Sequence, residues 1–277
     1  MSRRPSLVAA LLLSSHPVPG AAVTAVALTL AIAVGLEPWR IVVVTLAFAV
    51  NQLSIGWSND WIDAERDRVS GRRDKPVARG DIEPVTVRTA AFAALAVSAL
   101  LAFLLGPAAG AAHLVFVLSA WAYNAGLKST ALSVVPYVVS FGLLPAVVTL
   151  AAPEPRFAAW WALLAGALLG VAAHFTNVLP DLEDDSRTGV RGLPHRLGLR
   201  GAGITAFAAL ALGAAVVAAG SGGAPAVVGL SIVLLLCAIG VILVVRRRIS
   251  RALFVLVLVA ALVLVAMLAA SGGRVGA

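Results

Sequence analysis

The sequence predicts an all-α membrane protein in which about nine transmembrane helices form one bundle. Of its 277 residues, 61% are hydrophobic, whereas soluble domains contain roughly 45–50%. Apolar stretches of about twenty residues recur along the chain, and a helix of about this length crosses the hydrocarbon core of a bilayer. Charged residues make up only 12% of the chain and gather in a few connecting segments. These observations exclude an ordinary soluble domain and make the lipid bilayer an expected partner.

The expected spans lie at 17–36, 39–60, 86–106, 108–126, 131–152, 157–180, 202–220, 224–245 and 252–271. The first stretch is too long for a signal peptide and lacks a small-residue cleavage pattern, so we interpret it as a span. We expect residues 1–277 to form a single domain. The lone cysteine, Cys237, lies inside an apolar stretch and can form no intrachain disulfide.

Basic residues predict the orientation of the bundle. An N-terminus in the cytoplasm would place 18 of the 21 Lys and Arg residues inside, and only Arg40, Arg156 and Arg274 outside. Cytoplasmic loops of membrane proteins carry such an excess. We therefore expect a multi-pass cell-membrane protein with its N-terminus inside and its C-terminus outside. The net charge of +8 follows from this orientation, and no nucleic-acid partner is expected.

Two charged segments are related by an internal repeat. SNDWIDAERDRVSGRRDKPVARG, residues 58–80, aligns without a gap with TNVLPDLEDDSRTGVRGLPHRLG, residues 176–198, at an offset of 118 positions. Four expected spans separate the copies, so both should face the cytoplasm and the repeat should be parallel. Its halves are expected at about 17–126 and 131–245, followed by a ninth helix at 252–271. The identical residues in the first copy are Asn59, Asp63, Glu65, Asp67, Gly71, Arg73, Pro76 and Gly80.

Each copy predicts a polar stripe at the cytoplasmic end of a helix. Residues four positions apart on a helix lie on nearly the same face. Such trios are Asn59, Asp63 and Asp67 in the first copy, and Asn177, Asp181 and Asp185 in the second. Asp60 lies at the edge of the first stripe, whereas Glu65 and Glu183 point away from the stripes and are expected to have a structural role.

The two stripes predict a divalent metal site. Carboxylates held together near an apolar wall repel each other, and a divalent cation removes this conflict. Oxygen ligands without Cys or His favour Mg²⁺, or Mn²⁺ in its place, over zinc. Mg²⁺ often binds substrate phosphate as well, so two facing stripes can hold a diphosphate. The basic residues expected to neutralise its remaining charge are Arg72, Arg73, Lys75, Arg79 and Arg191.

These motifs resemble those of the UbiA-type intramembrane prenyltransferase superfamily. NDWIDAERD is similar to the first motif of that family, N-D-x-x-D-x-x-x-D, and DLEDD is similar to its second motif, D-x-x-x-D. AYNAGLKS resembles a family segment in which a tyrosine precedes a phosphate-contacting lysine. That likeness implies Tyr123, Asn124 and Lys128 at the diphosphate, with Asn124 standing where a serine is common.

The resemblance implies a prenyltransferase that binds a polyprenyl diphosphate through Mg²⁺. Ionisation of the diphosphate would give an allylic cation, which alkylates a lipophilic and often aromatic acceptor within the membrane. The implied catalytic residues are Asp60, Asp63, Asp67, Asp181 and Asp185. The same aspartates are the implied metal ligands together with Asn59 and Asn177, which also lie where the diphosphate would bind.

Two other functions stay open from the sequence. A membrane terpene cyclase of the same family would use the same clamp on a prenyl diphosphate alone, and products made without an acceptor would identify it. A transporter can also have parallel repeats and intramembrane carboxylates. Transport sites normally lie near the bilayer midplane, however, whereas these acids lie at helix ends beside arginine-rich segments.

Overall fold

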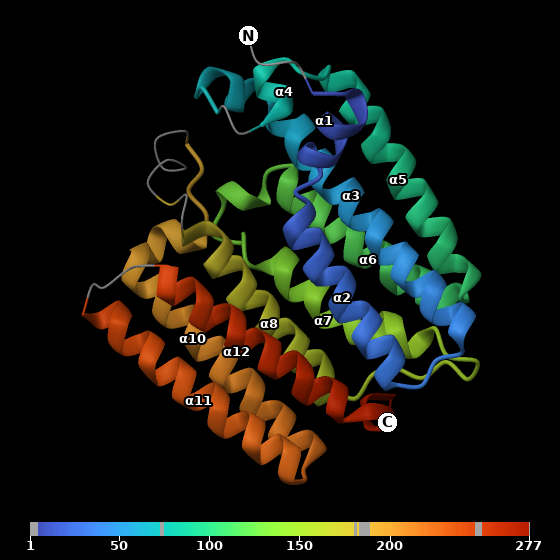
Figure 1. Cartoon of the computed structure of the whole chain (residues 1–277), viewed down its shortest axis with the longest axis vertical. Helices are drawn as coiled ribbons and strands as arrows, with labels where there is room; N and C mark the ends of the chain where they lie inside the picture. The colour runs from blue at the N-terminus through green and yellow to red at the C-terminus, as the bar shows by residue number, and fades with distance from the viewer. Residues whose placement is uncertain (1–4, 73–74, 180–181, 183–188, 247–250, 277) are drawn as a thin grey trace.

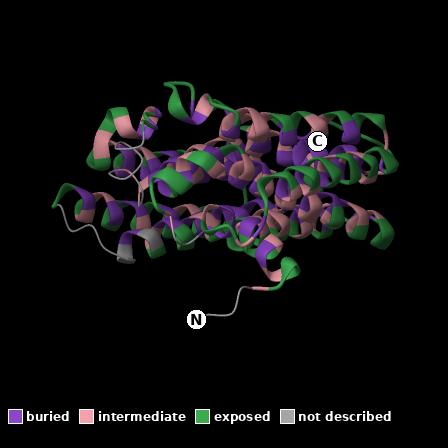
Figure 2. Cartoon of the chain, turned by 90° about the horizontal axis from the view of Figure 1, so that it is seen from above, coloured by how far each residue is buried: buried purple, intermediate pink, exposed green. Residues whose placement is uncertain are grey.

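The protein is a bundle of helices in its computed structural model (Figure 1). The structure describes residues 5–72, 75–179, 182, 189–246 and 251–276, and these ranges contain helices and no β-strand. Buried residues lie mainly between the helices, and exposed residues mainly on their outer sides (Figure 2). The largest buried side chains include Phe48, Phe116 and Phe207, which are at most 2% exposed.

The first half of the chain comprises α1 (Leu7–Ser14), α2 (Pro17–Ala33), α3 (Pro38–Val69), α4 (Pro76–Arg79), α5 (Pro84–Leu104) and α6 (Pro107–Asn124). From α2 to α6, each helix begins with proline, which lacks the N–H that would have no partner at a helix start and has a backbone angle suited to the first turn. The long helix α3 packs against α2, α5 and α6. It therefore holds this half together and carries the first charged motif at its end.

The second half comprises η1 (Leu127–Ser129), α7 (Val135–Leu150), α8 (Trp160–Val178), α10 (Leu193–Ser221), α11 (Ala224–Val245), α12 (Arg251–Ala270) and η3 (Gly272–Gly276). Helix α7 packs against α6 and α8, α10 against α8 and α11, and α12 against α11 and α2. The contacts thus run around the bundle, and the last long helix lies against the first (Figure 1).

Each expected span overlaps one described helix. Five helices in the described ranges are long and apolar enough to cross a membrane, or six if α1 and α2, which meet at 66°, form one bent span. Helix α7 and the described apolar part of α12 are shorter. These helices indicate a multi-pass membrane protein. The count of nine spans and the cytoplasmic position of the N-terminus remain predictions.

The helix bounds support a duplication. Helix α2 begins at Pro17 and α7 begins at Val135, which is the offset of 118 positions that relates the two charged segments. The same offset superposes α5 on the main part of α10, and α6 on α11, to within a few residues. Helix α12 follows the second half and falls, at the same offset, on α7, the first helix of that half. We retain the duplication as a proposal.

Two features differ from the expected boundaries. Helix α3 continues to Val69, well beyond the expected end of its span at residue 60, because the polar stripe extends the same helix. A short helix, α1, precedes the first expected span and packs against α3 and α4. It has only eight residues, too few to cross a bilayer, so a search for twenty-residue apolar stretches cannot find it.

Candidate active site

The first acidic motif forms a buried row along the last turns of α3. Asp60, Asp63 and Asp67 are 1%, 5% and 3% exposed. Their spacing by three and four residues places them along one side of the helix, and Asn59 is half-buried beside them. Glu65 points the other way, is exposed, and accepts hydrogen bonds from Arg68 at 2.8 and 3.0 Å. The structure therefore separates the three buried aspartates from the glutamate, as the helix spacing predicts.

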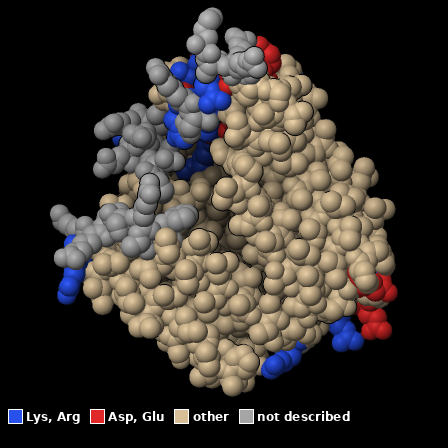
Figure 3. All heavy atoms as spheres, viewed as in Figure 1, with Lys and Arg blue, Asp and Glu red and all other residues tan. Residues whose placement is uncertain are grey.

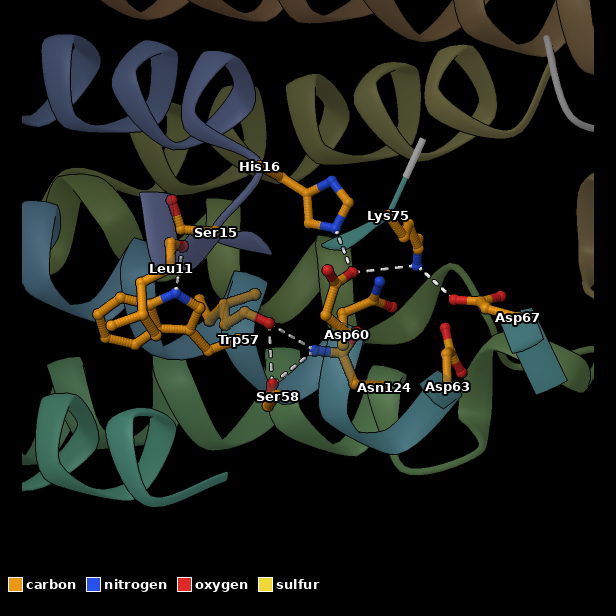
Figure 4. A network of polar contacts seen from close by, with 12 residues as sticks. Leu11, Ser15, His16, Trp57, Ser58, Asp60, Asp63, Asp67, Lys75 and Asn124 are labelled. Carbon is orange, nitrogen blue, oxygen red and sulfur yellow. Dashed lines mark hydrogen bonds and ion pairs between the residues drawn. The ribbon is translucent and has the colours of Figure 1, made fainter. Parts of the chain in front are cut away.

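Two buried lysines neutralise this acid row, and Figure 4 shows one of them, Lys75, between Asp60 and Asp67. The Lys75 ammonium lies 3.1 Å from Asp60 Oδ1 and 2.7 Å from Asp67 Oδ2. The Lys128 ammonium lies 2.6 Å from both carboxylate oxygens of Asp63, and donates to Asn59 Oδ1 at 3.3 Å. Lys75 precedes α4 and Lys128 lies in η1, so two connecting segments bring cations to one helix.

An arginine of α3 adds a third cation that the sequence analysis did not assign to the site. Arg66 Nη2 donates to Asp63 Oδ2 at 2.8 Å and lies 3.5 Å from Asp67 Oδ1. Arg66 follows Asp63 by three residues, and side chains at this spacing are neighbours on a helix. That spacing is the signal that could have identified it.

The surroundings shift the two lysine pKa values in opposite directions. Burial alone would lower the pKa of Lys75, but the carboxylates of Asp60 and Asp67 outweigh it and raise this pKa above its usual value. Burial also lowers the pKa of Lys128, where the attraction of Asp63 does not compensate and the positive charges of Arg66 and Lys75 lower it further. Lys128 is therefore the more easily deprotonated of the pair.

A histidine that the sequence analysis did not consider also contacts the row. His16, between α1 and α2, donates from Nε2 to Asp60 Oδ1 at 2.8 Å. The only sequence signal is a histidine directly before the proline that begins α2. This signal is too weak to connect it with Asp60, because the contact depends on how α1 folds back onto α3.

The donor set of the row suits a hard divalent cation. Asp60 Oδ2 is buried without a hydrogen-bond partner among the described residues, and a buried unpaired carboxylate oxygen is costly unless it meets a cation. Within the described ranges, no three His, Cys, Asp or Glu side chains are close enough to hold a metal ion. The first motif can thus supply oxygen ligands to a cation, and a second group of oxygen ligands would be needed beside it to hold a metal ion.

The predicted partners of that half lie outside the described residues. These are Asp181 and Asp185, together with Arg73 and Glu183. Asn177 is described, lies near the end of α8, and is exposed. Its amide donates to Tyr137 Oη at 3.4 Å, so the described beginning of the second motif contacts the ring cluster that follows.

A cluster of rings connects α6, α7 and α8. The Tyr123 ring lies 5.2 Å from that of Tyr137 and 5.8 Å from that of His174. Tyr137 in turn lies 6.1 Å from Phe141. Tyr137 therefore contacts both Tyr123 and Asn177. The described contacts of Tyr123 are with this ring cluster and not with the acid row.

The other predicted diphosphate residues have different surroundings. Asn124 is buried, and its amide donates to Ser58 Oγ at 2.8 Å and to Ile55 O at 3.0 Å, which joins α6 to α3 below the row. Arg79 pairs with Asp81, at 2.7 Å. Arg72 is half-buried after α3, and Arg191 is exposed before α10. Of the predicted basic residues, Lys75 and Lys128 are the two with described contacts to the acid row.

The face shown in Figure 3 is hollowed, and Lys and Arg side chains gather at the upper end of the hollow. Residues other than Lys, Arg, Asp and Glu form the walls that are visible below them. Cationic and acidic groups at one end of an uncharged recess can hold the charged end of an amphiphile, while the walls receive its apolar part.

The fold and the site define a helical membrane protein with a buried acid row at one end of its bundle. The sequence profile of the UbiA prenyltransferase family matches residues 20–262, and the chain belongs to this family. The resemblance to this family is thereby confirmed. Among curated protein sequences, none matches the chain.

Solved structures show the same fold at low sequence identity. A UbiA homologue from Archaeoglobus fulgidus bound to GPP and Mg²⁺ superposes with a TM-score of 0.72 and 15% identity, covering 97% of this chain and 100% of that chain. The apo structure of a UbiA homologue from Aeropyrum pernix K1 gives 0.65 and 18%, with 96% and 98% covered. A structure concerning digeranylgeranylglyceryl phosphate synthase gives 0.66 and 13%, with 97% and 98% covered.

Proposed function

We propose that the protein is a Mg²⁺-dependent prenyltransferase that moves a prenyl group from a polyprenyl diphosphate to a lipophilic, aromatic acceptor within the membrane. The observation that carries the proposal is the buried row of Asp60, Asp63 and Asp67, which is paired with the buried lysines Lys75 and Lys128. Family membership and the homologue bound to GPP and Mg²⁺ support it.

In this reaction the allylic carbon–oxygen bond breaks, and pyrophosphate leaves with the electron pair. The acceptor then forms a carbon bond to the allylic cation and loses a proton. Asp60, Asp63 and Asp67 would hold Mg²⁺ together with Asp181 and Asp185 of the second motif. Mn²⁺ could serve in place of Mg²⁺. When bound, the metal supplies positive charge that stabilises the departing pyrophosphate.

The residues of the chain contribute binding, orientation and exclusion of water. The ammonium groups of Lys75 and Lys128 can turn from the carboxylates to phosphate oxygens, because each lies on a flexible side chain within reach of the row. Four arginines would surround the outer side of the diphosphate: Arg72, Arg73, Arg79 and Arg191. An apolar recess inside the membrane keeps water from the cation, which water would otherwise quench. We place the opening on the cytoplasmic side.

The test is to incubate the purified protein in lipid nanodiscs with dimethylallyl, geranyl, farnesyl and geranylgeranyl diphosphates and a panel of phenols and quinols. Products are identified by mass spectrometry, and pyrophosphate release is measured with Mg²⁺, Mn²⁺, Zn²⁺ or excess chelator. We expect a prenylated acceptor with Mg²⁺ or Mn²⁺ only. Turnover in chelator would exclude the metal clamp, and products made from the diphosphate alone would show a cyclase.

Two matched variants identify the acids that carry the reaction. Asp63→Asn removes a buried charge from the row, and we expect pyrophosphate release to be nearly abolished because that charge would hold the metal. Glu65→Gln removes the charge of an exposed residue on the same helix, whose pair with Arg68 contributes little. We expect it to turn over at nearly the parental rate. Equal defects in the two variants would contradict the assignment of the acid row.

A further inference from the structure

The joint between α1 and α2 brings a histidine to the acid row in an unusual backbone conformation. His16 has φ 52° and ψ 63°, and it is the one non-glycine residue with positive φ among the described residues. Left-handed conformations cost energy and persist where the surroundings impose them, often at functional sites. Histidine is one of the few side chains enriched there.

Contacts with α3 fix this joint. The indole of Trp57 donates to Leu11 O at 2.8 Å, which ties α1 to α3 (Figure 4). Ser15 O lies so close to Gly56 that a side chain at this glycine would collide with it. The backbone next to His16 is therefore seated directly on the turn of α3 that precedes Asp60.

The two oxygens of Asp60 have different surroundings. His16 Nε2 donates to Oδ1 at 2.8 Å, and Lys75 lies 3.1 Å from the same oxygen. Oδ2 is buried and has no hydrogen-bond partner among the described residues. One oxygen is thus held from the α1–α2 joint, and the other is left to accept a further cation.

The internal repeat supports a functional pairing of these two residues. The position 118 residues after His16 is Val134, and the position 118 residues after Asp60 is Val178. The second copy therefore lacks both members of the pair. The histidine directly before the first half and the extra aspartate within that half are both replaced by valine at the corresponding positions of the second copy.

We propose that His16 is a positioning residue that fixes Oδ1 of Asp60, so that Oδ2 is presented as a ligand for the divalent cation. This inference rests on the proposed function. Groups that hydrogen-bond to a metal ligand orient it, and their removal typically weakens metal affinity roughly 10–100-fold. By this account α1 belongs to the active site, although it is too short to cross the membrane.

Two variants separate the contact from the backbone conformation. Asn accepts the left-handed conformation, but its amide nitrogen lies one bond closer to the backbone than Nε2 of histidine. His16→Asn should therefore keep the joint and lose the hydrogen bond. Gln places its amide nitrogen as many bonds from the backbone as Nε2, so His16→Gln should restore the contact. Ser15→Ala is the matched control, because among the described residues Ser15 Oγ donates to Leu12 O, at the end of α1.

The measurement is a titration of the full chain in nanodiscs with Mn²⁺ in the presence of pyrophosphate, followed by electron paramagnetic resonance. Thermal unfolding of each variant is recorded in parallel. We expect Mn²⁺ affinity to fall roughly 10–100-fold in His16→Asn, to be largely retained in His16→Gln, and to be unchanged in Ser15→Ala.

Unchanged Mn²⁺ affinity in His16→Asn, or an equal loss in His16→Asn and Ser15→Ala, would overturn the inference. An equal loss in His16→Asn and His16→Gln would also count against it, because reach would then not matter. The assay needs no acceptor and no turnover. A His16-dependent Mn²⁺ site in a protein that prenylates nothing would therefore overturn the proposed function and leave this inference standing.

Discussion

At the scale of single residues, the two buried lysines of the site hold their protons with different strength. Lys75 lies between two carboxylates, Asp60 and Asp67, and its pKa is raised despite burial. Lys128 faces the single carboxylate of Asp63, and burial keeps its pKa below the usual value. Both lysines are expected to contact the diphosphate. Of the two, Lys128 should lose its charge at a lower pH than an ordinary lysine does, because its pKa is lowered.

This difference predicts the alkaline side of the pH profile. A lysine with a lowered pKa is charged below that pKa and becomes neutral as the pH rises through it. The apparent affinity for geranyl diphosphate, measured as KM, should therefore weaken as the pH approaches the normal lysine range from below. Lys128→Arg keeps a charge at every accessible pH, so its alkaline loss should move to higher pH.

The matched control is Lys75→Arg. Because the pKa of Lys75 is raised, this variant should lose affinity for geranyl diphosphate at the same alkaline pH as the parent protein. An alkaline loss that moves in Lys75→Arg but stays in Lys128→Arg would show that the two roles are reversed.

At the scale of elements, the sequence predicted α3 and its polar row well, because a helix repeats every 3.6 residues and brings positions three and four apart together. It could not predict how the charges pair. Lys75 and Arg79 lie four residues apart in the same basic segment, yet Lys75 is buried against the acid row and Arg79 pairs with Asp81. Such choices depend on tertiary contacts of α4, which no local spacing encodes.

The close packing of α1 against α3 predicts that a side chain at Gly56 would destabilise the protein. In Gly56→Ala, the added Cβ would meet Ser15 O and the neighbouring backbone atoms, and overpacking of this kind costs about 1–3 kcal/mol. Replacing a helical glycine by alanine also gains about 1 kcal/mol, so the balance should be a net loss. We expect a lower midpoint of thermal unfolding and faster proteolysis at α1.

The control is Gly142→Ala in α7, where the nearest atom to an added Cβ is Ala167 Cβ at an ordinary 3.4 Å. Here only the gain in helix propensity should remain, so this variant should be at least as stable as the parent. Destabilisation of both variants by the same amount would mean that the close approach of α1 does not limit substitution at Gly56.

At the scale of the whole molecule, both charged motifs should lie on one side of the membrane. Figure 3 shows most of the visible Lys and Arg side chains at one end of the bundle. Helix α1 lies at that end, and η3 lies at the opposite end (Figure 1). The arrangement agrees with an odd number of crossings, and with the split of 18 to 3 among the Lys and Arg residues of the sequence.

Single-cysteine labelling tests this topology directly. Cys237 is 5% exposed and is replaced by alanine to remove background. Ser70→Cys follows the first motif, Arg196→Cys follows the second, and Gly273→Cys lies in η3; all three positions are exposed. A charged maleimide that cannot cross the bilayer should label Gly273→Cys in intact cells. It should reach Ser70→Cys and Arg196→Cys only in inverted vesicles.

Labelling of these two positions from opposite sides would rule out a parallel repeat, because the two motifs could not then form one clamp. Labelling of all three from one side would keep the clamp and require an even number of spans.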